Sequence, residues 1–313
     1  MEEIYEYHKF FGGGVMATHT IKIPAEIKPD YQNVFLLNLA FITAIHKASK
    51  QDTILFDFSR TSWIDAEMTV LLSMMFELAL LTSDNVTANI ETMPEKVKTI
   101  LQKNNFFPFY GLGPKMLDTF NTTITFFADT PSNDNNIHEY IKEEVFAAIG
   151  TKISDDFLKE VSYCIFEIVH NVRDHSGADR FYICGQHYPK QGILRLAISD
   201  LGIGLPAKVK QRNPHMTSDI EAVDWAFVDG NTTKRRKEGG VGLYSIKDFL
   251  HQRGQLKLIS NQAYYSISPT GTITTHTMSE RFRGTLLWIE FDINKCLKPK
   301  KNVRIESDDT FNF

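Results

Sequence analysis

The chain has 313 residues, a formal net charge of −4 and a hydrophobic content of 42%. This length allows one large domain or two ordinary ones, and the apolar content excludes global disorder. The charge gives no general attraction to nucleic acid or membranes, no apolar stretch is long enough to span a bilayer, and the three cysteines lack zinc or disulfide spacing. We therefore expect a soluble, cytoplasmic protein without nucleic-acid or membrane partners.

Short β-rich runs alternate with helical patterns between residue 17 and about residue 110. Strands are expected at 18–24, 53–58 and 86–90. Helices are expected at 31–48, from a cap at Asp65 to about Leu81, and from Pro94 to about Lys103. This alternation predicts an α/β layer with a mostly parallel or mixed sheet.

A segment rich in proline and glycine, 105–135, follows, with one strand candidate at 122–127. We place a domain boundary near Thr130. The division is then an N-terminal tail (1–16), a first domain (17–130), a second domain (131–297) and a C-terminal tail (298–313).

The second half begins with helical patterns and ends with strands. Helices are expected at 137–148, at 241–252, and from a cap at Asp155 or Asp156 along an apolar stripe that ends at Val172. Strands are expected at 180–187, 193–199, 255–260, 263–267, 272–278 and 285–292. The segment 205–238 has little periodicity. The order predicts a layer of helices on a mixed or antiparallel sheet.

Two polar residues lie one turn apart on the long helix. Glu167 and Asn171 are four positions apart, so they share a helix face. A carboxylate can act as a general base, and an amide oxygen one turn away can join the oxygen ligands of Mg²⁺. Taken alone, the pair also fits an ordinary solvated helix face.

The run 200–204, Asp-Leu-Gly-Ile-Gly, directly follows a buried-strand pattern. Asp200 can accept a hydrogen bond from an exocyclic amine such as that of adenine. Gly202 and Gly204 allow a sharp turn and close approach of a ligand to the backbone. A plain turn at the end of a strand would look the same.

Two further glycine-containing pieces come later in the chain. The run 239–243, Gly-Gly-Val-Gly-Leu, opens a predicted helix whose free N–H groups would favour an anion. The candidate phosphate contacts there are Gly239, Gly240, Gly242 and Leu243. The pair 284–285, Gly-Thr, enters the last strand, where Thr285 could bond near a bound base or its water.

These four pieces, in this order, resemble the GHKL superfamily, the ATPases of the gyrase, heat-shock chaperone, histidine kinase and mismatch-repair type. The resemblance covers about 136–294. It implies a Bergerat fold, an α/β sandwich that binds ATP with Mg²⁺, with Asn171 on the metal, Asp200 on adenine and the glycines of 239–242 beside the phosphates. Glu167 would be the general base in those members that hydrolyse ATP or transfer phosphate.

The segment between Gly204 and Gly239 would then be the ATP lid. It contains four consecutive cations, 234–237, of which Lys234 is our candidate for a phosphate contact. No separate helix with a phosphoacceptor histidine precedes the ATP domain, which argues against an ordinary sensor kinase.

The first half resembles, over about 17–112, a STAS domain (sulphate transporter and anti-sigma antagonist). The residues that carry this resemblance are the strand 53–59 and the run 63–66, Trp-Ile-Asp-Ala. Antagonists of this family have a phosphorylated Ser or Thr where this chain has Ala66, so that switch is absent here. Thr61 and Ser62 are on the wrong side of the turn. We expect a docking surface at an exposed helix start, with the chain's own ATP domain as its partner.

We expect a two-domain regulatory protein that binds ATP and Mg²⁺ and acts on a protein partner, as a serine/threonine kinase or a slow ATPase. Its nearest resemblance is to the anti-sigma-factor serine kinases. The alternatives are a non-catalytic module whose protein interactions depend on nucleotide, and a histidine-kinase-type component without its own phosphoacceptor domain. A homodimer is compatible with each of them.

Overall fold

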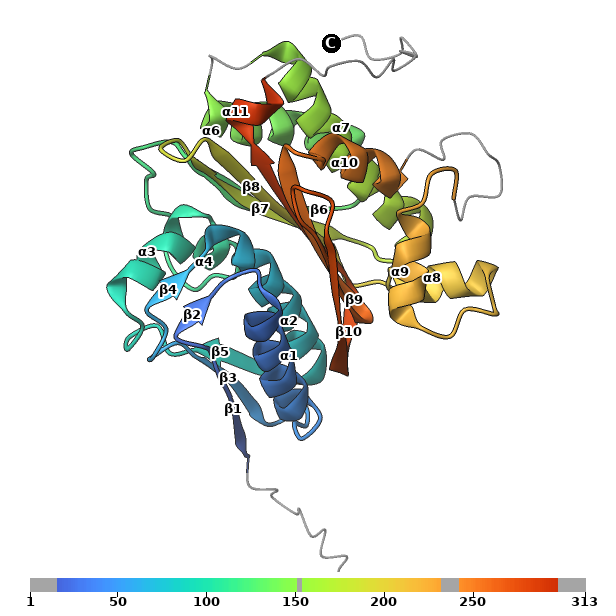
Figure 1. Ribbon diagram of the computed structural model, residues 1–313. Helices are drawn as coiled ribbons and strands as arrows, with labels where there is room; N and C mark the ends of the chain where they lie inside the picture. The colour runs from blue at the N-terminus through green and yellow to red at the C-terminus, as the bar shows by residue number, and fades with distance from the viewer. Residues whose placement is uncertain (1–15, 151–153, 232–241, 298–313) are drawn as a thin grey trace, which may run out of the picture.

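The computed structural model describes residues 16–150, 154–231 and 242–297, which form an α/β structure with several sheets (Figure 1). The first half builds a parallel sheet in the order β1-β3-β5 and a separate parallel pair, β2-β4. Its strands are β1 (Thr18–Lys22), β2 (Glu26–Ile27), β3 (Thr53–Asp57), β4 (Trp63–Ile64) and β5 (Asn85–Ala88). Its helices are α1 (Tyr31–Ile45), η1 (Ala66–Met68), α2 (Thr69–Thr82), α3 (Glu95–Lys103) and α4 (Phe106–Phe109).

The second half builds a five-stranded sheet in the order β6-β7-β8-β10-β9. Every pairing in it is antiparallel, which is one of the two alternatives expected for this half. Its strands are β6 (Thr123–Asp129), β7 (Phe181–Tyr188), β8 (Ile193–Asp200), β9 (Gly254–Ile267) and β10 (Ile273–Asp292). Its helical segments are α5 (Asp134–Tyr140), η2 (Ile141–Phe146), α6 (Ala147–Ile149), α7 (Asp155–Asn171), η3 (Val172–Ser176), α8 (Leu205–Arg212), α9 (Asp219–Ala226), α10 (Gly242–Leu250) and α11 (Ile293–Cys296).

The large sheet separates two hydrophobic cores, because successive side chains of a strand point to opposite faces. Along β8, Leu196 and Ile198 belong to the core under α7 and α10, whereas Ala197 belongs to the core shared with the first half. Along β10, Leu287 belongs to the core under α7 and α10, and Trp288 belongs to the core shared with the first half. Figure 1 shows α7 and α10 on one face of this sheet and α1 and α2 on the other.

The helix α2 shows why this arrangement forms. Its residues from Val70 to Phe76 are all buried, and a helix that is apolar all round must be covered on every side. It lies between the parallel sheet and the large sheet. The hydroxyl of Thr69, its first residue, lies 3.7 Å from the Cys184 sulfur of β7. The first half is therefore packed directly onto the outer face of the second.

The structure differs from the sequence analysis in several places. The strand β6 pairs with β7, so the second sheet begins before the boundary expected near Thr130. The four strands expected after residue 254 are two long ones, β9 and β10. The segment after Gly204 contains two helices, α8 and α9, although little periodicity was seen there. Asp65 makes no cap bond to the helix and instead accepts from the Trp63 indole at 2.7 Å.

In the described ranges, no helix combines the length and the apolar character needed to cross a membrane.

Candidate functional site

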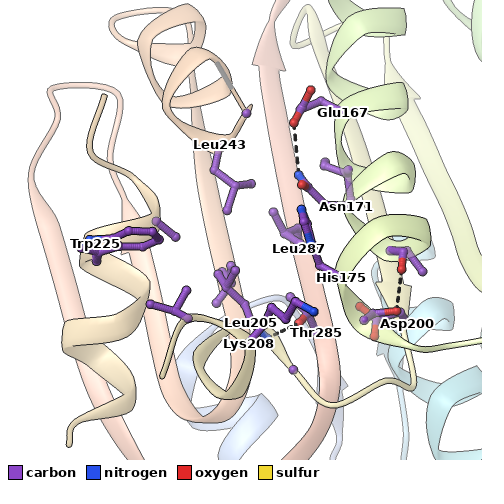
Figure 2. Close-up of a pocket in the computed structure, with 18 of the residues that line it drawn as sticks. Glu167, Asn171, His175, Asp200, Leu205, Lys208, Trp225, Leu243, Thr285 and Leu287 are labelled. Atoms are coloured by element: carbon purple, nitrogen blue, oxygen red, sulfur yellow. Dashed lines mark hydrogen bonds between the residues drawn. The ribbon is translucent and has the colours of Figure 1, made fainter. Parts of the chain in front are cut away.

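Seven of the candidate residues line one pocket between α7, α8, α9 and the inner face of β10 (Figure 2). They are Glu167, Asn171, Asp200, Gly204, Gly242, Leu243 and Thr285, whereas Gly202 is not among the lining residues. The pocket is open to solvent and encloses about 850 Å³ including its mouth.

The long helix α7 supplies Glu167 and Asn171. Ser154 caps the helix by accepting from the Phe157 amide, and a buried apolar stripe that includes Ile168 fixes its rotation against the sheet. The Asn171 amide Nδ2 lies 3.4 Å from Glu167 Oε1 (Figure 2). This bond leaves the amide oxygen of Asn171 as the group able to bind a cation.

The helix continues past Asn171 as a π-helical turn, η3. Such turns are rare and often occur at functional sites, because the extra residue changes the direction of the side chains that follow. Here His175 and Ser176 both line the pocket. The turn therefore extends the polar wall begun by Glu167 and Asn171.

Asp200 ends β8 on the floor of the pocket, opposite Thr285 of β10 in the strand register. Its side chain is 4% exposed and accepts from the Gly202 amide at 2.7 Å. Burial raises the pKa of Asp200 to about 6, against the opposing hydrogen bonds from Gly202 and Ser176. A buried acceptor with this environment is suited to a ligand that donates a hydrogen bond.

The glycines around Asp200 are required by close contacts. A Cβ at Gly202 would collide with the backbone oxygen of Ser176, and Gly204 has a φ of +87°. Beyond Gly204, the Leu205 amide donates to the hydroxyls of Ser260 at 3.0 Å and Thr285 at 3.1 Å. Thr285 thus holds the start of α8 as well as facing the pocket, a role that the sequence did not indicate.

Gly242 and Leu243 begin α10 at the top of the pocket. A Cβ at Gly242 would come within 3.1 Å of Glu167 Oε1, so the absence of a side chain keeps space between α10 and α7. Three other candidates, Lys234, Gly239 and Gly240, lie outside the described residues.

The sequence analysis missed pocket residues contributed by the two helices α8 and α9. Lys208 and Trp225 face the pocket from these helices, opposite α7 (Figure 2). The sequence did offer a signal for α9, because Ser218 begins a capping pattern that ends at Glu221. In the structure Ser218 accepts from the amides of Ile220 and Glu221. The α9 helix is fixed to β9 by a 2.6 Å hydrogen bond between Asp224 and Tyr265.

Asn171 brings to the pocket an amide oxygen that could bind a magnesium ion. Among the residues described, no group of three or more histidine, cysteine or carboxylate side chains is placed to hold a metal. Magnesium usually takes one or two protein oxygens and completes its shell with phosphates and water. Asn171, with Glu167 beside it, can provide such a partial shell.

The first-half candidates are arranged differently from the expectation. The start of the helix is buried, with exposures of 8% for Asp65 and 6% for Ala66, and the Cys184 thiol of β7 lies 3.5 Å from the Ala66 carbonyl. The expectation of an exposed helix start is therefore wrong. Thr61 is also buried, whereas Ser62 is exposed.

No protein-family model matches the chain, and a search of curated proteins finds no match.

Proposed function

We propose that the chain is a GHKL-type regulatory protein that binds ATP with Mg²⁺ in the pocket between α7, α8 and α9. The observation that carries this proposal is that candidate residues far apart in the sequence line one pocket. Glu167 and Thr285 are 118 positions apart, and both line it. An ordinary helix face or turn gives no reason for these segments to meet.

The polarity of the pocket supports a separate position for each part of the proposed ligand. Asp200 and Thr285 form a buried polar floor suited to the adenine amine, and Leu205 and Leu287 supply apolar contacts to its faces. Glu167 and Asn171 lie higher on the same wall, where the metal and phosphates would meet them. The amide groups that begin α10 would face the phosphates.

Glu167 gives the chain a general base, so we propose protein Ser/Thr phosphorylation or slow ATP hydrolysis as its chemistry. The first half, STAS-like in its parallel sheet and in the Trp-Ile-Asp-Ala run, would serve protein interaction in the cytoplasm. It lacks a hydroxyl at Ala66, so it would not serve as the phosphoacceptor at that position.

The test is calorimetric titration of the full chain with ATP, with and without Mg²⁺, together with an assay of ADP release. We expect Asn171→Ala to remove the Mg²⁺ dependence of binding. Glu167→Gln should retain ATP binding and lose turnover, because the two side chains act on a metal and on a proton respectively.

Glu143→Gln provides a matched control, because it makes the same change at an exposed carboxylate that pairs only with its neighbour Lys142 in the salt bridges described. It should alter neither binding nor turnover. Failure of the wild-type chain to bind ATP would reject the proposal. Equal loss of ATP affinity in both α7 variants would instead make Glu167 and Asn171 structural.

A further inference from the structure

A second cavity lies on the other face of the large sheet, between that sheet and the start of η1. It encloses about 620 Å³ including its opening. Its polar and charged lining residues are Lys28, Asp30, Asp65, Glu67, Arg195, Gln255, Lys257 and Glu290, with the indole of Trp288. It shares no lining residue with the pocket between α7, α8 and α9, so the two cavities are separate.

The strand register explains how these side chains come together. Glu290 of β10 lies between Arg195 of β8 and Gln255 of β9, in one row across the sheet. In the next row Trp288 lies beside Lys257. All of them point toward the first half, because they alternate with residues of the inner core.

Most charges in this cavity already have partners. The Arg195 Nε donates to Glu290 at 2.7 Å, and its Nη1 lies 3.6 Å from Asp65. The Gln255 amide donates to the other oxygen of Glu290 at 3.0 Å. These bonds hold the charged side chains in place around the cavity.

Two buried groups in the lining of the cavity lack a hydrogen-bond partner within the described part of the chain. Glu67 is 1% exposed and neither carboxyl oxygen makes a hydrogen bond; Arg195 Nη1 lies 3.8 Å from its Oε1. The Trp288 Nε1 is also without a partner, and its side chain is 4% exposed. Leaving such buried groups unsatisfied lowers the stability of the fold, so we expect a ligand or water to supply the missing bonds.

The charges of the lining exclude simpler ligands. A bare divalent cation would lie against Arg195 and Lys257, and a simple anion would face Asp65, Glu67 and Glu290. A molecule with a cationic donor at one end and an anionic acceptor at the other satisfies both sets of groups.

We propose that this cavity binds a small zwitterion of the amino-acid class, whose ammonium group donates to Glu67 and whose carboxylate accepts from Trp288 and Lys257. Because the cavity is closed on one side by η1 and on the other by the sheet, its ligand would hold the first half against the second. The site is independent of the proposed ATP function.

The experiment is calorimetric titration of the full chain with each of the twenty protein amino acids at millimolar concentration. Acetate and methylammonium, the two halves of the ligand, are titrated in parallel. We expect at least one amino acid to bind, and each half alone to bind at least about tenfold more weakly, since each forfeits a charged hydrogen bond. The proposal is overturned if no amino acid binds, or if either half binds as tightly as the best amino acid.

Three variants locate the binding. Glu67→Gln, Trp288→Phe and Lys257→Met should each weaken it at least about tenfold, while the surface change Glu143→Gln should leave it unaltered. Near-ultraviolet circular dichroism checks that each variant is folded, and Lys257, the most exposed of the three, keeps the test available if the buried changes disturb folding. Unchanged affinity in the folded variants would reject the site.

Discussion

Asp200, the residue that we propose binds the adenine amine, has a buried carboxylate that costs the fold stability at neutral pH. Its carboxylate is buried at the end of β8, and burial raises its pKa from 3.8 to about 6. The folded chain therefore holds a proton on this group more tightly than the unfolded chain does. The associated stability is fully present below about pH 4 and is lost as the pH rises through 6.

We predict that Asp200→Asn makes the ligand-free chain more stable at pH 8, by on the order of 2 kcal/mol, and leaves its stability at pH 4 nearly unchanged. The asparagine oxygen can still accept from Gly202 but carries no buried charge. Urea unfolding at the two pH values measures the difference.

The same change should weaken ATP binding by about 1.5–3 kcal/mol, because a charged acceptor for the adenine amine is lost. Calorimetry with ATP checks this. A variant that is less stable at pH 8, or that binds ATP as well as the wild type, would show that the Asp200 carboxylate does not have this role.

At the scale of elements, the sequence predicted most helices and strands because their patterns are local. The apolar stripe of α7 and the β-rich run of β3 need no distant partner to be seen. The pairing of β6 with β7 could not be predicted, because it depends on contacts between residues about 60 positions apart. The same is true of the cavity at Glu67, which forms only when η1 meets β8 and β10.

The candidate pocket was predictable to the extent that each piece has a local signature. Glu167, Asn171, Asp200 and Gly204 stand in recognisable runs, and the structure brings them together. Trp225 has no such signature, since an aromatic residue on a short helix is usually part of a core. Its place in the pocket follows from the packing of α9 on β9.

The break in the register of β10 between Phe282 and Thr285 depends on one glycine. Gly284 has a φ of +80°, and a Cβ there would collide with the backbone oxygen of Asp200. We predict that Gly284→Ala lowers the free energy of unfolding by about 3 kcal/mol or more, because strain and a backbone collision add. Urea unfolding monitored by circular dichroism measures the loss.

Gly271 offers a matched control with nearly the same backbone conformation. Its φ is +82°, but a Cβ there would only touch the His251 ring at an ordinary 3.5 Å. Gly271→Ala should therefore lower the free energy of unfolding by only about 1–2 kcal/mol, because only the backbone strain of an alanine at positive φ is added. Equal losses in the two variants would show that the contact with Asp200 carries no energy of its own.

At the scale of the whole molecule, the two halves share one hydrophobic core. Phe126 of β6 contacts Phe106 of the first half edge-on, at 6.1 Å between ring centroids, and stacks on Tyr182 of β7 at 6.3 Å. Its amide also donates to the Asn104 carbonyl at 2.6 Å. An interface of this apolar character couples the stability of two units.

We predict that the full chain unfolds in one transition, with the same urea midpoint by circular dichroism and by tryptophan fluorescence. Phe126→Ala should lower both midpoints together, at a cost of about 3–5 kcal/mol. Phe120→Ala makes the same change at a side chain that is 80% exposed, and should shift neither. Two separate transitions in the wild type would mean that the halves are independent.

The two-sided covering of the large sheet also determines where backbone amides can exchange with solvent. Strand β8 lies between β7 and β10. Its adjacent residues Ala197 and Ile198 are both fully buried, one on each face of the sheet. Deuterium can reach their amides only when both cores open, so these amides should exchange at the rate of global unfolding. The tip of β10 at Ile273, which is 45% exposed, should exchange far sooner, and hydrogen-exchange mass spectrometry would show that gradient along one sheet.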